Sequence, residues 1–348
     1  MATRADSAPT TATSDRPRTD PAPENRFRRI GPVQAVAALL LTGLAAVATL
    51  PDLLGGLDCH SPFVQLVSFR PWIVAGLLVL TLLVIAATVI WRRLWPFAAG
   101  LLAVALVGSA LLLPRIVPDP LPTGGRPLTV VAFNTSEGQA DVAAVAELIS
   151  AERPDLVALP EAGARYADEL APLVEPLGYR LLPSTPQEQP DGGGVTALAS
   201  SGLGNVTVHY GDTSYPFVEV SGGDLGTLRF VAYHALSPRP ESIPVWRADV
   251  ARLAHWCAGP TPAIVAGDLN ATLDHSALRA SVSGCGDAGE QRGRGLVPTW
   301  GPSSDTRMFG PQIDHVLMTD GIAAESFEVR DMPGSDHRAV VSRLRLPG

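Results

Sequence analysis

The stretch PAIVAGDLNAT, residues 262–272, decides the fold class. Its first half is short, apolar and rich in small and β-branched residues, which is typical of a buried strand. The strand ends at Asp268, and Asn270 follows two residues later. On an extended backbone the two side chains project to the same side. A buried strand with polar groups at its tip is typical of an α/β domain that builds a site from its strand ends.

The same pattern recurs upstream. LTVVAFNT (residues 128–135) is a β-rich run with Asn134 near its tip, and LVALPEA (residues 156–162) is another that ends at Glu161. The segment between them, DVAAVAELISAERPD, has apolar residues at helical spacing and ends at a proline. Strand, helix and strand in this order indicate an α/β domain.

Four more strands are predicted for GVTALAS, LRFVAYHA, IDHVLMT and AVVSRLRL, and a helix is predicted for residues 245–256. Their ends add the polar residues His234, Asp314, Asp336 and His337. Any one of these has an ordinary explanation as a turn residue, a helix cap or a solvated surface group. Six polar strand ends within one domain together predict a shared site.

The motifs FNT, LPEA, YHALSP, GDLNAT, IDHV and SDHRAV, in this order, resemble those of the endonuclease/exonuclease/phosphatase superfamily. The resemblance extends from about Leu128 to Leu346, and the GDLN and SDH pair is its most specific part. It implies an α/β fold of the DNase I type, a two-sheet β-sandwich flanked by helices in four layers. It also implies hydrolysis of phosphoester bonds with Mg²⁺, or Mn²⁺ or Ca²⁺ in its place.

The resemblance also implies roles for the polar residues. Glu161, Asn134 and Asp336 are the expected metal ligands, because hard divalent cations prefer oxygen donors. Asp268 is the expected base that orients or deprotonates the attacking water. Asn270 is expected to hold Asp268 or the phosphate in place.

His337 and His234 are expected to donate hydrogen bonds to the non-bridging phosphate oxygens as charge develops there. Asp314 is expected to hydrogen-bond His337 and so to fix its tautomer. An acid–histidine pair also occurs in serine hydrolases, but the chain has no G-x-S-x-G motif, which disfavours acyl hydrolysis.

The chain departs from the family pattern at one position. Ser201 follows the glycine-rich strand where many members have Arg. The phosphate contact is then expected from elsewhere, with Arg239, Arg247 and Arg338 as candidates. A structural role stays equally open for Arg338, because on a strand its side chain points away from that of His337. Trp300 is expected either to line the pocket or to belong to the core.

The first third of the chain contains three apolar runs without a charged residue: Gly31–Leu50, Trp72–Trp91 and about Leu94–Leu113. Each is close to the roughly 20 residues that a helix needs to cross a bilayer. A cleavable signal peptide fits the first run poorly, because its leader is long and two apolar runs follow. The predicted organisation is a disordered cytoplasmic tail (1–30), three transmembrane helices (31–113), a Pro-rich linker (114–126) and the catalytic domain (127–348).

Positive charge sets the orientation of such helices. Basic residues precede the first span and lie between the second and third: Arg26, Arg28, Arg29, Arg92 and Arg93. Both places are expected to face the cytoplasm. The chain is therefore predicted to be a multi-pass cell-membrane protein whose catalytic domain lies outside the cytoplasm.

Charge and cysteine content bear on the substrate and the compartment. Residues 1–119 hold ten Arg and seven acidic residues, a balance of +3, whereas the remainder holds 16 Arg and 27 acidic residues, a balance of −11. A domain this acidic would repel long nucleic acids but would admit a small phosphorylated substrate. In an oxidising compartment Cys257 and Cys285 could form a disulfide, which the sequence leaves open.

Three spans exceed what a tether requires, which favours a substrate that resides in the bilayer. The leading hypothesis is metal-dependent hydrolysis of a phosphoester or pyrophosphate of a membrane lipid, a polyprenyl phosphate or a phospholipid, at the outer membrane face. The arrangement is similar to membrane-anchored actinobacterial members of the superfamily, the teicoplanin-resistance type among them. Two alternatives stay open, an extracytoplasmic nuclease and a non-catalytic membrane interaction protein. The sequence indicates no protein partner.

The orientation is testable with a reporter joined to the C-terminal end of the chain. We expect an alkaline phosphatase fusion to be active, because three spans carry that end to the side opposite the Arg-rich tail. A β-galactosidase fusion at the same position is the control and should be inactive. The reverse pattern, from two stably expressed fusions, would invert the orientation.

Overall fold

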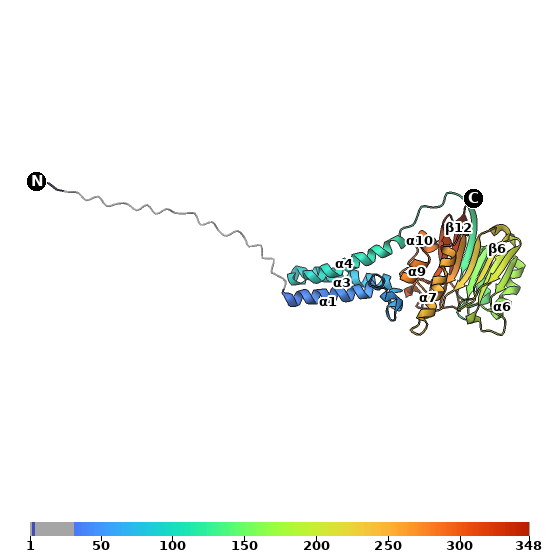
Figure 1. The fold of residues 1–348 in the computed structure, drawn as a ribbon, viewed down its shortest axis with the longest axis horizontal. Coiled ribbons are helices and arrows are strands. Elements are labelled where there is room, and N and C mark those ends of the chain that lie inside the picture. Colours follow the sequence, from blue (N-terminus) through green and yellow to red (C-terminus); the bar gives the residue numbers. More distant parts are fainter. Residues whose placement is uncertain (1, 4–30, 348) are drawn as a thin grey trace.

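The computed structural model describes residues 2–3 and 31–347, so the predicted disordered tail, residues 1–30, lies outside the described residues at all but two positions. In the described part of the chain, long helices form a bundle at one end of the molecule and a layered α/β domain forms the other end (Figure 1).

Three long helices within the described residues form the bundle: α1 (Pro32–Thr49), α3 (Arg70–Ile90) and α4 (Trp95–Leu112). Each is long and apolar enough to cross a membrane, and the mean hydropathies of the three spans are 1.8, 2.9 and 2.2. Leu101 and Ala105 of α4 are buried in the bundle, whereas Leu40 of α1 and Leu82 of α3 are exposed. A surface of this kind suits lipid better than water. The three helices match the three predicted spans.

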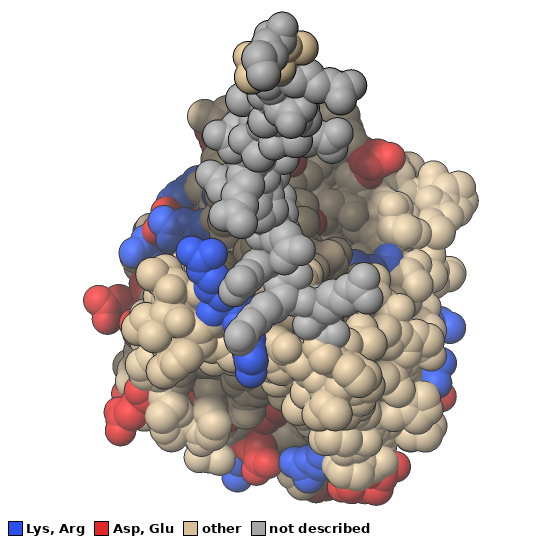
Figure 2. Space-filling model, turned by 90° about the vertical axis from the view of Figure 1, so that its left-hand side faces the viewer, with Lys and Arg blue, Asp and Glu red and all other residues tan. Residues whose placement is uncertain are grey.

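Arg92 and Arg93 lie in the short link between α3 and α4, at the end of the bundle away from the domain. Gln34, near the start of α1, donates a hydrogen bond to the carbonyl of Arg93, which places both ends together. Figure 2 looks at this end of the molecule and shows basic side chains on the face turned towards the viewer. The length of the bundle therefore separates these arginines from the α/β domain.

The α/β domain contains two six-stranded sheets within the described residues. The first has the order β11-β12-β1-β2-β4-β3 and the second β5-β6-β7-β8-β10-β9. The strands of the first sheet are β1 (Arg126–Ala132), β2 (Leu156–Pro160), β3 (Tyr179–Pro183), β4 (Val195–Ser200), β11 (Ala323–Asp331) and β12 (Arg338–Leu346). Those of the second are β5 (Val206–Tyr210), β6 (Val218–Gly222), β7 (Arg229–His234), β8 (Ala263–Asp268), β9 (Cys285–Asp287) and β10 (Asp314–Thr319).

Helices cover the outer faces of both sheets. The first sheet packs against α5 (Val142–Glu152) and α6 (Ala164–Val174). The second packs against α7 (Ile243–Arg252), α8 (Ala254–Cys257) and α9 (Ser276–Ser281), and α10 (Ala288–Gln291) follows β9. Figure 1 shows α7 and α9 on the side that faces the helix bundle and α6 on the far side. These four layers confirm the predicted two-sheet sandwich.

Alternation along the strands builds the core. Val130 of β1 and Ile264 of β8 belong to the apolar cluster between the sheets. Their neighbours Val131 and Val265 belong to the clusters beneath the helices on the two outer faces. Successive strand residues point to opposite faces, so strands covered on both faces must be apolar throughout. This explains why β1 and β8 are continuous apolar runs in the sequence.

All strands and helices predicted for the domain are present, although the helix predicted for residues 245–256 is divided into α7 and α8. Eight further elements of the domain are not predicted by the sequence pattern: β3, β5, β6, β9, β11, α6, α9 and α10. Most of these are short. The edge strand β5 (VTVHY) and its neighbour β6 (VEVSG) have only five residues each and are partly exposed, so each gives a weak strand signal in the sequence.

Buried charged side chains join the bundle to the domain. Arg70, at the start of α3, donates to Asp274 Oδ1 at 2.6 Å and to the Thr49 carbonyl at 2.9 Å, and it also pairs with Asp52. Arg115, just after α4, donates to both carboxylate oxygens of Asp274 at 2.6 and 3.0 Å. Breaking a buried pair of this kind leaves an uncompensated charge and is costly. The ends of α3 and α4 are therefore held against the segment that follows β8.

The segment between α1 and α3 also packs against the domain. Its short helix α2 (Phe63–Val67) inserts Val64 into the apolar cluster beneath the second sheet. His275 Nε2 lies 2.9 Å from the Val64 carbonyl, and the Asp58 carboxylate accepts a hydrogen bond from the Ser276 amide at 2.6 Å. The bundle and the domain thus share one continuous buried interface.

The structure joins Cys257 of α8 to Cys285 of β9 by a disulfide, the pairing that the sequence left open. Cys59 is not part of a disulfide. The bond links the layer of outer helices to the last strand of the second sheet, and a disulfide of this kind suits an oxidising compartment.

Gly267 occupies a position in GDLN that has no room for a side chain. Its φ is +145°, and a Cβ atom there would lie 1.9 Å from the Tyr233 carbonyl oxygen of β7. The glycine therefore allows the backbones of β7 and β8 to approach at the point where their site residues begin.

We expect Gly267→Ala to destabilise the domain by roughly 2 kcal/mol or more, because both the backbone angle and the contact with Tyr233 become unfavourable. The thermal midpoint of the purified chain measures this. Gly193→Ala is the matched control, since open space surrounds that position, and should leave the midpoint unchanged. Equal midpoints for the two variants would contradict the conclusion that position 267 has no room for a side chain.

Candidate active site

Strand ends from both sheets meet at one edge of the sandwich and surround a cavity of about 690 Å³. Six of the eight residues predicted for the site line this cavity: Glu161, His234, Asp268, Asn270, Asp336 and His337. The other two, Asn134 and Asp314, are fully buried and hydrogen-bond to lining residues. The structure therefore brings together all eight predicted residues.

Asn134 connects the two sheets at the centre of the site. Its Nδ2 donates to Glu161 Oε1 at 2.9 Å and to Asp268 Oδ2 at 3.0 Å, while its Oδ1 accepts from the Ser136 amide at 2.9 Å. The Glu137 amide donates to Glu161 Oε2 at 2.8 Å. In this orientation Asn134 holds the two carboxylates together and presents its NH₂ group to them.

His337 is held by Asp314. Its Nδ1 lies 2.9 Å from Asp314 Oδ2, and its Nε2 lies 3.7 Å from Asp268 Oδ2. The imidazole therefore donates to Asp314 on one side and presents Nε2 to Asp268 and the cavity on the other. This is the geometry expected for a histidine that donates a hydrogen bond to a phosphate oxygen.

His234 also lies beside Asp268. Its Nε2 is 3.6 Å from Asp268 Oδ2 and 3.7 Å from Glu161 Oε1, and the Tyr215 ring stacks on it with a centroid distance of 4.2 Å. Asn270 donates from its backbone amide to Asp268 Oδ1 at 2.8 Å and from Nδ2 to the Ala235 carbonyl at 3.0 Å. Asn270 thus contacts Asp268, one of the two partners expected for it.

Burial and neighbouring charges set the protonation of these groups. Burial lowers the pKa of His234 to about 3, so its imidazole is neutral, and burial raises the pKa of Asp268 to about 7. Burial alone would lower the pKa of His337, but Asp314 and Asp268 raise it to about 9. Burial also raises the pKa of Glu161, and the hydrogen bonds from Asn134 and Glu137 oppose this.

Two site residues have left-handed backbone conformations. The φ angles are +58° at Glu161 and +46° at Asn270. Asparagine adopts this conformation readily, but glutamate does so at some cost. Strain of this kind often lies at functional sites, and here the turn after β2 directs the Glu161 carboxylate towards Asn134.

Asp336 lies at the rim of the cavity. Its Oδ2 accepts a hydrogen bond from Trp300 Nε1 at 2.9 Å, and both residues line the cavity. Trp300 therefore belongs to the pocket wall, one of the two places expected for it. Asp336 is partly exposed and lies near enough to Glu161 for its charge to raise the pKa of Glu161. Asp336 is not part of the close group of possible metal ligands that Glu161, His234 and Asp268 form.

Arginines line the cavity at two places. Arg239, a predicted candidate, lines it, whereas Arg338 instead hydrogen-bonds to Asp331 and the Pro298 carbonyl. Arg247 is an exposed residue of α7 and is not among the lining residues. Ser201 follows the end of β4 opposite the site, so its difference from the family pattern does not affect the cavity.

Other lining residues had no clear signal in the sequence. Arg165 of α6 donates to Asp191 Oδ2 at 2.6 Å, and Asp191 is buried beside the glycine-rich strand. Tyr215 comes from an irregular segment before β6. These residues reach the cavity only through folding of loops between distant strands, which no local pattern records.

The donors at the centre of the cavity fit a divalent cation. A carboxylate oxygen of Glu161, a carboxylate oxygen of Asp268 and a ring nitrogen of His234 lie within 4.8 Å of one another. Two carboxylates held this close repel each other, and a cation relieves that repulsion. Mostly oxygen donors with one neutral imidazole suit Mg²⁺, Mn²⁺ or Ca²⁺. In the second cluster, Asp268, Asp314 and His337, the Asp314–His337 hydrogen bond already occupies two of the donors.

Comparison with known proteins agrees with this site. Residues 131–337 match the family model described as Endonuclease/Exonuclease/phosphatase family, a segment that runs from β1 to His337. The chain belongs to this family. Its members are phosphatases and nucleases, typically hydrolytic and usually metal-dependent. None of the curated proteins compared matches the chain.

Solved structures of the endonuclease/exonuclease/phosphatase family share the fold. A humanized TDP2 from D. rerio with 14 mutations aligns with a TM-score of 0.51 and 15% identity, over 63% of this chain and 99% of that one. The AP endonuclease LMAP from Leishmania major aligns with a TM-score of 0.51 and 15% identity, over 69% and 95%. At this identity the likeness establishes the fold, and the substrate has to be argued from the site.

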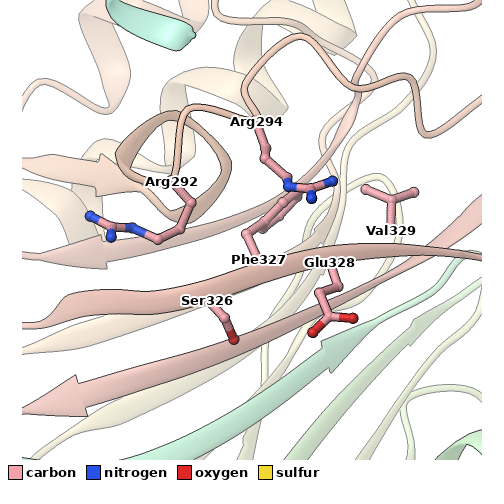
Figure 3. Close-up of a pocket in the computed structure, with 6 residues that line it drawn as sticks. All are labelled: Arg292, Arg294, Ser326, Phe327, Glu328 and Val329. Atoms are coloured by element: carbon pink, nitrogen blue, oxygen red, sulfur yellow. The ribbon is translucent and has the colours of Figure 1, made fainter. Parts of the chain in front are cut away.

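A second hollow, of about 350 Å³, lies on the outside of β11. Figure 3 shows Arg292 and Arg294 on one side of it and Ser326 to Val329 along the strand on the other. Arg292 donates to the Asp119 carbonyl at 2.9 Å, so it holds the chain that leads into β1. This hollow therefore lies next to the predicted linker, and it shares no lining residue with the candidate active site.

Metal binding is testable without an activity assay. We expect Mg²⁺ or Mn²⁺ at a hundredfold excess over its dissociation constant to stabilise the full chain by about 2.7 kcal/mol, seen as a higher thermal midpoint. Glu161→Gln removes one charged ligand and should abolish most of this increase. Glu147→Gln, an exposed residue of α5, is the control. An equal increase in both variants would place the cation elsewhere.

Proposed function

We propose that the chain is a divalent-metal-dependent phosphoesterase that hydrolyses a phosphoester or pyrophosphate of a membrane lipid at the outer membrane face. The observation that carries the chemistry is the convergence of Glu161, Asp268 and His337, from three separate strand ends, on one cavity. The family supports hydrolysis of a phosphate compound, and the cavity offers groups for each part of that reaction.

Different residues of the cavity are proposed for different parts of the reaction. Glu161 and Asp268, held by Asn134, are placed to bind the cation, with His234 beside them. A bound divalent cation would neutralise phosphate charge and stabilise the leaving oxygen. Asp268 also lines the cavity, where its carboxylate can orient the attacking water. Burial raises the pKa of Asp268, which suits a group that accepts a proton from that water.

His337 supplies positive charge where the phosphate becomes more negative. As an imidazolium it donates Nδ1–H to Asp314 and turns Nε2–H into the cavity. A donor fixed in this way needs little reorganisation during the reaction. Arg239 lines the same cavity and is a second cation for a phosphate oxygen.

The charge of the cavity argues against the nuclease alternative. Among the described residues, the lining contains five carboxylates, from Glu137, Glu161, Asp191, Asp268 and Asp336, but only two arginines, Arg165 and Arg239. Arg165 is already paired with Asp191. Nucleic-acid binding relies on neutralising many phosphates along a basic surface, so a substrate with one or two phosphates fits better.

The proposed location rests on the helices and the disulfide. Three membrane-competent helices, the arginines at the end of the bundle away from the domain, and the bond between Cys257 and Cys285 all favour a catalytic domain outside the cytoplasm. A non-catalytic membrane protein would have no reason to retain the complete hydrogen-bonded set around Asp268.

We expect Asp268→Asn and His337→Ala each to lower phosphate release by about 10²-fold or more, because each removes a group that acts on the reacting atoms. Circular dichroism and the thermal midpoint check that both variants remain folded. Arg247→Ala, an exposed change on α7, is the control and should keep full activity. Activity retained in both site variants would remove the assignment.

The substrate class is tested by phosphate release from polyprenyl pyrophosphate, phospholipid and oligonucleotide at equal concentration, with and without EDTA. We expect EDTA-sensitive release from a lipid substrate and little from the oligonucleotide, because the cavity is acidic. Preferential cleavage of the oligonucleotide would favour the nuclease instead.

A further inference from the structure

Three large apolar side chains lie exposed where the helix bundle meets the domain. Trp72, in the first turn of α3, is 48% exposed, Met308 is 55% exposed and Phe309 is 64% exposed. The rings of Trp72 and Phe309 lie 5.7 Å apart between centroids. Adjacent exposed apolar side chains of this size on a soluble surface usually mark a contact with lipid or protein.

The position of Trp72 identifies lipid as the partner. Trp72 and Trp91 bracket the apolar part of α3, and their separation along a helix is roughly 28 Å at 1.5 Å per residue. That length is close to the roughly 30 Å thickness of the hydrocarbon core, and tryptophan is enriched at its two boundaries. Trp72 therefore marks the membrane boundary nearer the domain, and Phe309 lies at the same level.

Other apolar side chains at this end of the bundle agree. Leu53, just after α1, is 54% exposed, and Ile116 and Val117, just after α4, are 52% and 53% exposed. These residues follow the domain-side ends of the spans, so the exposed apolar surface continues around the bundle. A single bilayer surface would cover all of them.

The segment that carries Met308 and Phe309 is attached to the catalytic histidine. Arg307 is buried, and its NH1 donates to the carbonyls of Met332 at 2.8 Å, Ser335 at 3.0 Å and His337 at 2.9 Å. At the other end of the segment the Gly301 amide donates to the Asp336 carbonyl at 3.2 Å. The apolar tip and the SDH motif are therefore one hydrogen-bonded unit.

The other side of the cavity is attached to the same bundle. Asp274, six residues after Asp268, accepts hydrogen bonds from Arg70 of α3 and from Arg115 after α4. Both the GDLN and the SDH segments are thus connected to the ends of membrane helices. The cavity mouth consequently has a fixed position relative to the helix bundle.

We infer that Trp72, Met308 and Phe309 form a lipid-contact patch that rests on the bilayer surface beside the catalytic cavity, so that a membrane-embedded phosphate compound reaches the cavity without leaving the membrane. The contact with lipid stands on its own geometry, whereas the route of the substrate rests on the proposed function. The polar cavity takes the phosphate group, and the patch borders the acyl or prenyl chain that stays in the bilayer.

The contact is tested with the full-length chain in phosphatidylcholine vesicles. In a Cys59→Ser background, Phe309→Cys carries an environment-sensitive fluorophore, and Met308→Cys provides a second labelled position. The matched control is Leu173→Cys, which is 44% exposed on α6, on the far side of the domain (Figure 1). Vesicles with brominated acyl chains quench only fluorophores that enter the bilayer.

We expect brominated lipid to lower the fluorescence at position 308 or 309 by about twofold and to leave position 173 unchanged, as for side chains that insert roughly 5–10 Å into the interface. Quenching at neither 308 nor 309 overturns the inference. So does equal quenching at 173, because it would mean that the whole domain surface adsorbs to lipid.

A second measurement addresses the substrate route. We expect Met308→Ser/Phe309→Ser to lower kcat/KM for polyprenyl pyrophosphate in vesicles by about tenfold while p-nitrophenyl phosphate hydrolysis stays unchanged, since only the lipid contact is lost. An equal loss on both substrates contradicts the route. Quenching without hydrolysis of any phosphate compound would overturn the proposed function and leave the lipid contact, so the two failures are distinguishable.

Discussion

The Asn134 amide, which donates to Glu161 and to Asp268, is the interaction on which the site depends. Glu161 follows a strand of the first sheet and Asp268 ends a strand of the second, so their carboxylates meet only because the sheets pack face to face. Like charges this close repel, and burial strengthens the repulsion. The amide donors and the nearby His337 offset it in part, and a divalent cation would complete the compensation. The demand for a cation thus arises from the way the two sheets are packed.

Buried charges also determine the junction between the bundle and the domain, but there the neighbouring charges are opposite and attract each other. Asp274 is fully buried and is tolerated because Arg70 and Arg115 surround its carboxylate. Buried pairs of this kind contribute little net stability against an apolar replacement, but loss of one partner leaves an uncompensated buried charge. The three long helices and the catalytic edge are consequently positioned relative to each other.

Histidines in this chain show how surroundings decide the role of one residue type. His337 is charged because Asp314 and Asp268 flank it, and His234 is neutral because burial dominates. His315, the residue after Asp314, is buried between Asp287 and the Ala271 carbonyl and has a structural role. The sequence places His315 and His337 equally close to strand ends, and only their partners separate a structural histidine from one that faces the cavity.

The sequence alone determined the class of fold, the three long apolar helices and all eight residues gathered at the site, because these depend on local patterns: apolar runs, their period, and polar groups at strand tips. It did not reveal the edge strands, the cavity residues Tyr215 and Arg165, or the attachment of the helix bundle through Asp274. These depend on contacts between segments far apart in the chain, such as Arg70 with Asp274 and Arg307 with the His337 carbonyl. Tertiary structure decided them, because a buried charge or a loop residue acquires its role only from the partners that folding brings to it.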